Sequence, residues 1–218
     1  MAGYRVRLQR VAVRGGADLH IRSLLDNQQF ADADGAARTA GICSASWSLF
    51  GQLWPSSMKL ADLMQGWAIA DRRILEVGCG LGLASLVIHR RGGRVTASDC
   101  HPLAGPFLQA NLRLNQMPDL RFRAGHWQRF DADLGRFDLI IGSDVLYERS
   151  HPEQLAGFIQ HHAVAKVDVL IVDPGRGNRS AFRRALEPRG FRLEETHLDE
   201  PLSDGTRYRG RLLHYRRT

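Results

Sequence analysis

The chain has 218 residues, of which 44% are hydrophobic and 24% charged, and its formal net charge is +7. This length and composition are those of one globular domain with a sizeable core. No run of about 18 apolar residues occurs, which excludes a membrane-spanning helix. The start, MAGYRVRLQR, lacks the apolar core of a secretory signal. We therefore expect a cytoplasmic protein.

The cysteines, histidines and arginines indicate no metal site and no nucleic-acid partner. Cys43, Cys79 and Cys100 form no CxxC pair, and their odd number argues against a disulfide framework. No histidine lies at metal-ligand spacing from another histidine or a cysteine. The arginines are spread along the chain and concentrate only in the closing segment 207–218. The basic charge is therefore not evidence of nucleic-acid binding.

The N-terminal part is expected to be a small β extension. Residues 4–24 alternate apolar and basic side chains around Gly15 and Gly16, a pattern that predicts a hairpin. Residues 26–46 are polar and rich in alanine and glycine, which predicts an irregular connection. We therefore divide the chain into an N-terminal extension with its connection, residues 1–46, and a main domain, residues 47–218.

The main domain begins with a predicted helix after Pro55. Leu60, Leu63, Met64 and Trp67 recur at helical spacing and give this helix one apolar face, so we expect Trp67 in the core.

From residue 72 onward, predicted strands and helices alternate. The predicted strands are 72–78, 93–99, 120–124, 137–142, 167–173, 191–197 and 209–216. The predicted helices are 83–91, 102–117, 150–164 and 180–188, the third opening with a capping box from Ser150 to Glu153. Several strands are uninterrupted apolar runs, which is typical of parallel strands covered on both faces.

This alternation predicts an α/β fold with a doubly wound, seven-stranded, mostly parallel sheet. The last two strands have no long helix between them, so we expect them to pair antiparallel. In such sheets ligands bind beyond the carboxyl ends of the strands. That rule directs attention to the segments that follow Val77, Ser98, Gly142 and Val172.

A glycine-rich loop follows the first strand of the main domain, in the sequence LEVGCGLG. Gly78, Gly80 and Gly82 permit a tight strand-to-helix turn and a close approach of the backbone to a ligand. The next strand ends in Asp99, about 20 residues further on, where an acid can accept both hydroxyls of a ribose. Helix capping is the alternative role for Asp99.

Two classes of cofactor use this arrangement, and the charge of Glu76 favours one of them. A carboxylate two residues before the first glycine repels a pyrophosphate but can receive an α-ammonium group. S-adenosylmethionine (SAM) carries an ammonium, a sulfonium and a ribose but no phosphate. The sequence therefore predicts SAM rather than a nicotinamide dinucleotide.

The chain resembles the class I SAM-dependent methyltransferases and, more narrowly, the methyltransferase-like protein-lysine methyltransferases called family 16. The resemblance runs from Trp47 to Arg176 and rests on LWPSSMKLA, LEVGCGLG, SDCHP, the tryptophan of AGHW, and SDVLYE. It implies a Rossmann-like domain that transfers a methyl group from SAM to a lysine side chain of a protein substrate.

The resemblance also implies roles for individual residues. Trp54 is expected to contact the methionine end of the cofactor, Trp127 to pack on its adenine, and Ser143 to contact it through the backbone. Trp47 is the alternative to Trp54. The cofactor-binding residues that we predict are Trp54, Glu76, Gly78, Cys79, Gly80, Gly82, Asp99, Trp127 and Ser143.

Asp144 and Tyr147 match the D-x-x-Y motif of that family, which is linked to placement of the substrate lysine. We expect Asp144 to draw in and orient the ammonium group, and Tyr147 to add one hydrogen bond or its ring face. Asp173 can cap a helix, and Arg176 is interpreted as a solvated side chain. Asn111 and Asn115 are interpreted as surface polar residues.

Other functions remain open at this stage. A SAM-dependent enzyme of the same fold can act on a small-molecule amine, a protein arginine or a nucleic acid, although SDVLY replaces the NPPY-type motif common among enzymes of the last kind. A NAD-dependent oxidoreductase and a non-catalytic SAM-binding protein are further alternatives.

Overall fold

The computed structural model describes residues 4–26, 28–29, 32, 35–39, 41–42 and 47–218. About half of the predicted connection 26–46, including Cys43, lies outside these residues. Within it the structure describes one short helix, α1 (Ala36–Thr39). The predicted hairpin is confirmed, because β1 (Val6–Val11) pairs antiparallel with β2 (Leu19–Leu24) in a separate two-stranded sheet.

The main sheet has seven strands, as predicted. Its order is β5-β4-β3-β6-β7-β9-β8, and only β9 pairs antiparallel with its neighbours β7 and β8. The strand bounds are β3 (Arg73–Val77), β4 (Arg94–Asp99), β5 (Arg121–Ala124), β6 (Phe137–Ser143), β7 (Ala163–Asp173), β8 (Arg192–Leu198) and β9 (Gly210–Arg217). The order reverses between β3 and β6, which is where a doubly wound sheet binds its ligand.

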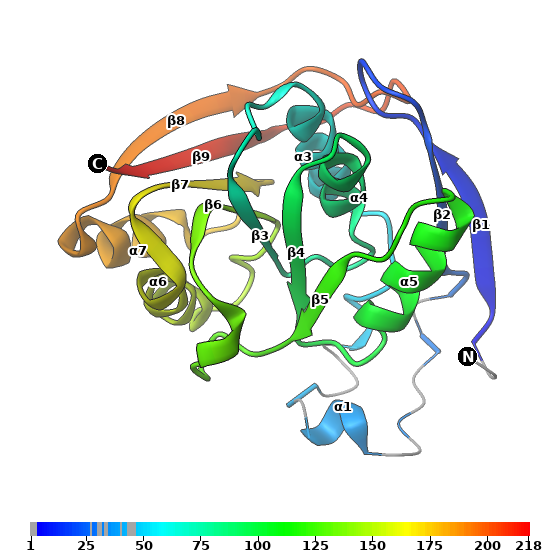
Figure 1. The fold of residues 1–218 in the computed structure, drawn as a ribbon, viewed down its shortest axis with the longest axis horizontal. Helices are drawn as coiled ribbons and strands as arrows, with labels where there is room; N and C mark the ends of the chain where they lie inside the picture. Colours follow the sequence, from blue (N-terminus) through cyan, green and yellow to red (C-terminus); the bar gives the residue numbers. More distant parts are fainter. Residues whose placement is uncertain (1–3, 27, 30–31, 33–34, 40, 43–46) are drawn as a thin grey trace.

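Helices cover both faces of this sheet (Figure 1). On one face lie α3 (Pro55–Gly66), α4 (Leu83–Arg90) and α5 (Ala104–Leu114), and on the other α6 (His151–His162) and α7 (Arg179–Leu186). Consecutive strand residues alternate between the two cores: Ile74 belongs to the first and Leu75 to the second. Short 3-10 turns at Ala132–Leu134 and Glu187–Arg189 complete the domain.

Two local predictions about helices need correction. The capping box of α6 does not form, because Ser150 itself has helical dihedral angles and its side chain accepts no hydrogen bond from the first turn. Glu153 instead accepts from Arg189 at 2.5 Å. Trp67 is only partly buried, because α3 ends at Gly66 and the indole packs edge-on against His214 at the rim of the core.

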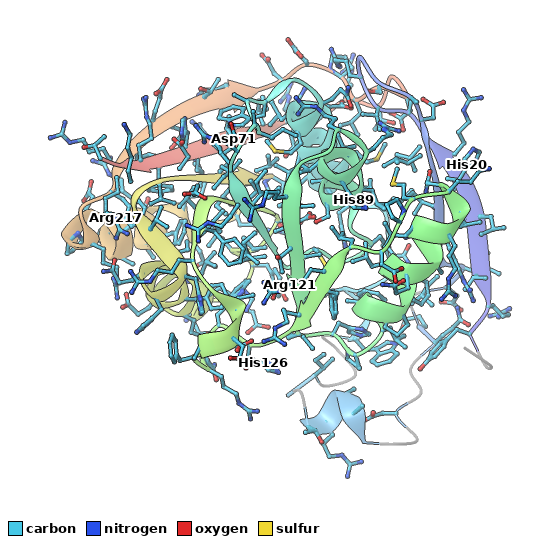
Figure 2. The ribbon with its side chains drawn as sticks, in the orientation of Figure 1. His20, Asp71, His89, Arg121, His126 and Arg217 are labelled. Atoms are coloured by element: carbon cyan, nitrogen blue, oxygen red, sulfur yellow. The ribbon has the colours of Figure 1, made fainter. Side chains whose placement is uncertain are left out.

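Asn111 is not a surface residue, whereas Asn115 is half-buried, and both join the hairpin to α5. Asn111 is fully buried; it accepts from the backbone amide of Arg22 at 2.7 Å and donates to the carbonyl of Leu81 at 3.2 Å. Asn115 accepts from the amide of His20 at 2.9 Å and donates to its carbonyl at 2.7 Å. Figure 2 places His20 beside the end of α5. The two side-chain amides thus form hydrogen bonds with backbone groups on the edge of β2 that does not pair with β1.

Replacing Asn111 by alanine is expected to lower the free energy of unfolding by about 2 kcal/mol, because it leaves two buried backbone groups without partners. Urea denaturation measures this loss. Replacing the exposed Arg113, on the same helix, serves as the matched control and is expected to change stability by less than about 0.5 kcal/mol. Equal effects of the two changes would contradict this role for Asn111.

The hairpin contributes Val11, Leu19, Ile21 and Leu24 to the same core as α3, α4 and α5. The division of the chain at residues 46 and 47 stays a prediction. Within the described ranges, none of the helices has the length and apolar character needed to cross a bilayer.

Candidate active site

A cavity of about 270 Å³ opens at the carboxyl edge of the sheet. The strand register explains its place, because Val77 lies opposite Gly142 and Ser143 opposite Val172, so that the loops after β3, β6 and β7 meet there. Of the predicted site residues, those lining the cavity are Trp54, Gly78, Cys79, Gly80, Asp99, Trp127, Ser143, Asp144 and Tyr147. Glu76 and Gly82 are not among the lining residues.

The glycine loop needs its glycines for two reasons. Gly78 and Gly80 have φ angles of 59° and 54°, a left-handed conformation that other residues rarely adopt. A Cβ atom at Gly78 would meet the Val145 side chain at 2.9 Å, whereas one at Gly80 would meet no protein atom within 4 Å. The backbone at Gly80 is therefore open to a ligand in the cavity.

Asp99 holds this loop in place. Its Oδ2 accepts from the Gly80 amide and its Oδ1 from the His101 amide, both at 2.8 Å. Burial raises the pKa of the Asp99 carboxyl, and these backbone hydrogen bonds oppose the shift. The helix-capping alternative is wrong, because α5 begins at Ala104 and its cap is Leu103. Each Asp99 oxygen keeps a second lone pair for a hydroxyl in the cavity.

Glu76 is buried against the start of α4. It is 2% exposed, and its Oε2 accepts from both the amide of Ser85, at 2.8 Å, and the Ser85 hydroxyl. The carboxyl thus binds the first turn of α4 through Oε2, and its predicted contact with the cofactor stays a prediction. Burial raises its pKa from 4.5 to about 7, and the hydrogen bonds from Ser85 oppose the shift.

This raised pKa predicts a pH dependence of stability. Because the folded protein holds the Glu76 proton more tightly than the unfolded chain, stability is lost as the pH rises from 4.5 to about 7. The loss from this group is expected to be about 3 kcal/mol. Chemical denaturation of the wild type and of Glu76→Gln across this range measures it. A constant difference between the two proteins would contradict the prediction.

Gly82 serves the packing of α4 instead of lining the cavity. It is the residue before that helix, with a φ of 78°, and a Cβ atom there would meet the Leu108 side chain at 2.6 Å. The predicted cofactor contact at Gly82 is therefore corrected to close contact between α4 and α5.

The tryptophans divide between the cavity and the core. Trp54 and Trp127 line the cavity, and the Trp54 Nε1 donates to the carbonyl of Leu49 at 2.9 Å. Trp47 is 2% exposed and does not line the cavity; its ring lies 4.5 Å from that of His101. Of the two candidates for the methionine end, only Trp54 lines the cavity.

Asp144 and Tyr147 lie together at the cavity, but the carboxylate already has a partner. The Arg176 Nε donates to Oδ1 at 2.8 Å and its Nη2 to Oδ2 at 2.9 Å. Arg176 is exposed, as expected of a solvated side chain, but it also lines the cavity and forms a bidentate ion pair with Asp144. This hydrogen bonding raises the pKa of Arg176. Burial raises the pKa of the Tyr147 phenol, so the hydroxyl is protonated at neutral pH.

Three histidines line the cavity, His101, His126 and His151, and the sequence analysis missed all of them. His151 packs edge-on against both Trp127 and Tyr147, with centroid distances of 5.1 and 4.5 Å. His101 stacks on Phe50 at 4.0 Å, and burial lowers its pKa to about 4, so this imidazole is neutral. His101 lies in the quoted SDCHP motif, but nothing in the pattern indicated its burial.

The cavity has the chemical groups that SAM requires. The open backbone at Gly80 and the free lone pairs of Asp99 suit a ribose, and Trp127 offers a flat apolar surface. His126, which Figure 2 shows beyond the end of β5, lines the same side. Among the described residues no group of three or more His, Cys, Asp or Glu side chains is arranged to hold a metal ion.

The fold is that of the class I SAM-dependent methyltransferases. Magnesium protoporphyrin IX methyltransferase from Synechocystis PCC 6803, solved with SAM bound, superposes with a TM-score of 0.58 at 19% identity, covering 75% of this chain and 80% of that one. At this identity the likeness concerns the fold alone.

The chain belongs to the lysine methyltransferase family, whose model matches residues 42–184. It is 28% identical to mouse EEF1A lysine methyltransferase 3 over 160 residues, covering 70% of this chain and 68% of that enzyme. It is also 28% identical to the electron transfer flavoprotein beta subunit lysine methyltransferase of Xenopus laevis over 148 residues, covering 65% of this chain and 58% of that enzyme. The predicted fold class, family and cofactor, SAM, are thereby confirmed.

Proposed function

We propose that this enzyme transfers a methyl group from SAM to the side-chain amine of a lysine in a partner protein. The observation that carries the proposal is that the glycine loop, Asp99 and the pair Asp144 and Tyr147 all line the same cavity. The names of the relatives support a protein lysine as the acceptor.

The cofactor is assigned to the half of the cavity built by β3, β4 and the loop after β5. Asp99 would accept the ribose hydroxyls, Trp127 would pack on the adenine, and Trp54 would contact the methionine end. Ser143 and the backbone of Gly78 and Gly80 would line the space between. When bound, SAM supplies a methyl carbon activated by its sulfonium, and the amine lone pair forms the new N–C bond as the C–S electron pair returns to sulfur.

The residues of the chain act on the lysine. At neutral pH the ammonium group must lose a proton, at a cost of about 4 to 5 kcal/mol for an ordinary pKa. The protonated phenol of Tyr147 can donate a hydrogen bond to the amine or accept one from it. Asp144 would form the side of the cavity against which the amine lies. Orientation of the lone pair toward the methyl carbon is the main contribution expected of these residues.

Two other proposals concern the cellular compartment of the enzyme and the class of its acceptor. We place it in the cytoplasm, on the composition and cysteine usage of the chain. Nucleic acid is a less suitable acceptor, because the position after β6 carries SDVLY, without the motif common in enzymes that methylate exocyclic amines of bases.

The test is incubation of the enzyme with radiolabelled SAM and a lysate from a strain that lacks this gene. One or a few labelled protein bands are expected. Label only in nucleic acid or in small molecules would contradict the choice of acceptor, and binding of SAM without any transfer would indicate a non-catalytic SAM-binding protein.

A further inference from the structure

The carboxylate nearest the proposed lysine is neutralised by a guanidinium from the next strand. Asp144 follows β6 and Arg176 follows β7, and both carboxylate oxygens of Asp144 accept from Arg176. The side chain of Asp144 is 13% exposed and that of Arg176 is 44% exposed. The bidentate geometry makes this a strong and directional ion pair.

Each partner of this pair is held by its own backbone support. Asp144 adopts a φ of 53°, which is uncommon for an aspartate, and its amide donates to the carbonyl of Val172 at 2.8 Å. The turn that carries Arg176 is closed by Asp173, whose buried Oδ1 accepts from the amides of Gly175 at 2.8 Å and Arg176 at 3.0 Å. The pair is thus set by two strand ends and not by flexible side chains alone.

The charge of this pair decides which form of an amine the site favours. An unpaired carboxylate beside a lysine stabilises the ammonium, and an opposite charge within about 4 to 6 Å raises the pKa of such a group by roughly 1 to 3 units. The ammonium form has no lone pair and cannot accept a methyl group. An unpaired Asp144 would therefore bind the unreactive form.

We propose that Arg176 is a positioning residue that neutralises Asp144, so that the site orients the substrate amine without stabilising its protonated form. This inference rests on the proposed function, since it assigns a role at the same site. It makes Arg176 a determinant of the protonation state in which lysine is held.

The other charged and titratable groups around Asp144 do not supply this balance. Asp173 is an acid paired with Arg179 at 3.5 Å, and neither residue lines the cavity. Tyr147 and Tyr208 are phenols whose pKa values burial raises, so both are uncharged near neutral pH. Arg176 is the cation in contact with Asp144 in the described part of the chain.

Two cofactor analogues measure the local charge without any acceptor protein. Sinefungin carries an amine-bearing carbon in place of the sulfonium of SAM, whereas S-adenosylhomocysteine carries no charge at that point. The ratio of their dissociation constants, measured by calorimetry at pH 7, reports how strongly the site favours an ammonium. In Arg176→Gln this ratio is expected to shift roughly tenfold or more toward sinefungin, with little change for S-adenosylhomocysteine.

Three further variants separate charge from structure. Asp144→Asn/Arg176→Gln removes both charges and is expected to return the ratio to within about threefold of the wild type. Arg176→Lys keeps the positive charge and is expected to shift the ratio by less than Arg176→Gln does. Arg149→Gln, at an exposed arginine outside the cavity lining, removes the same net charge and is expected to leave the ratio unchanged.

The outcomes distinguish this inference from the proposed function. An unchanged ratio in Arg176→Gln, with normal binding of S-adenosylhomocysteine, would overturn the role of Arg176 and leave the methyltransferase assignment intact. Failure of the wild type to bind S-adenosylhomocysteine would overturn both.

The acceptor protein identified by labelling allows a second readout. The pH at which the single-turnover rate reaches half its alkaline maximum is expected to rise by about one unit in Arg176→Gln and to return in the double variant. A purely structural role would lower the rate equally at every pH and would contradict the inference.

Discussion

Replacing Asp99 by alanine is expected to weaken the binding of S-adenosylhomocysteine about 100-fold. The Asp99 carboxylate fixes the amides of Gly80 and His101 and is assigned to the ribose hydroxyls. Loss of hydrogen bonds to a charged group costs about 1.5 to 3 kcal/mol each, and 1.4 kcal/mol corresponds to a factor of ten in affinity. Isothermal titration calorimetry at neutral pH measures the change directly.

Thermal denaturation without ligand shows whether the Asp99 variant still folds. Asp119→Ala, at an exposed acid before β5, is the matched control and is expected to bind S-adenosylhomocysteine as the wild type does. Wild-type affinity in a folded Asp99→Ala protein would mean that Asp99 does not bind the ribose. The proposed orientation of the cofactor would then be wrong.

Replacing Asp144 by asparagine is expected to reduce the second-order rate constant of methyl transfer about 100-fold while the affinity for S-adenosylhomocysteine changes less than threefold. The change keeps the shape of the side chain but leaves the guanidinium of Arg176 without a carboxylate partner beside the amine, and misplacement of the amine by about 1 Å is enough for such a loss. Tyr147→Phe removes one hydrogen bond, so a loss of about tenfold is expected.

These losses are measured as initial rates with radiolabelled SAM and the acceptor band from the lysate. Glu148→Gln is the control, since it removes a neighbouring charge that does not line the cavity. Full activity in both Asp144→Asn and Tyr147→Phe, with the cofactor still bound, would mean that these residues do not place the lysine.

The sheet was predictable because its signals are local. Uninterrupted apolar runs such as 137–142 and 167–173 mark parallel strands, and the missing helix between the last two strands marks the antiparallel pair. The hairpin was equally clear from its glycines. The burial of Asn111 was not, because its partner Arg22 lies 89 residues away and the side chain gives no sign of which face of α5 is covered.

Site residues were predictable where the local backbone or its contacts require one particular residue type. Gly78 and Gly80 are required by the left-handed turn, Asp99 accepts from the Gly80 amide, and all three line the cavity. The contact of Glu76 with Ser85 was not predicted, because nothing in the pattern indicates that a serine nine residues later faces the carboxyl. Arg176 was missed, because its partner lies 32 residues earlier; the adjacency of β6 and β7 was the available signal.

The most direct measurement of the central claim is the chemical identity of the methylated amino acid. The acceptor labelled by the wild-type enzyme is hydrolysed in acid, and the radioactive product is compared with methylated standards. We expect ε-N-methyllysine, and its yield should be zero or strongly reduced when Asp144→Asn replaces the wild type. Recovery of the label in methylarginine, methylhistidine or a non-protein amine would contradict it.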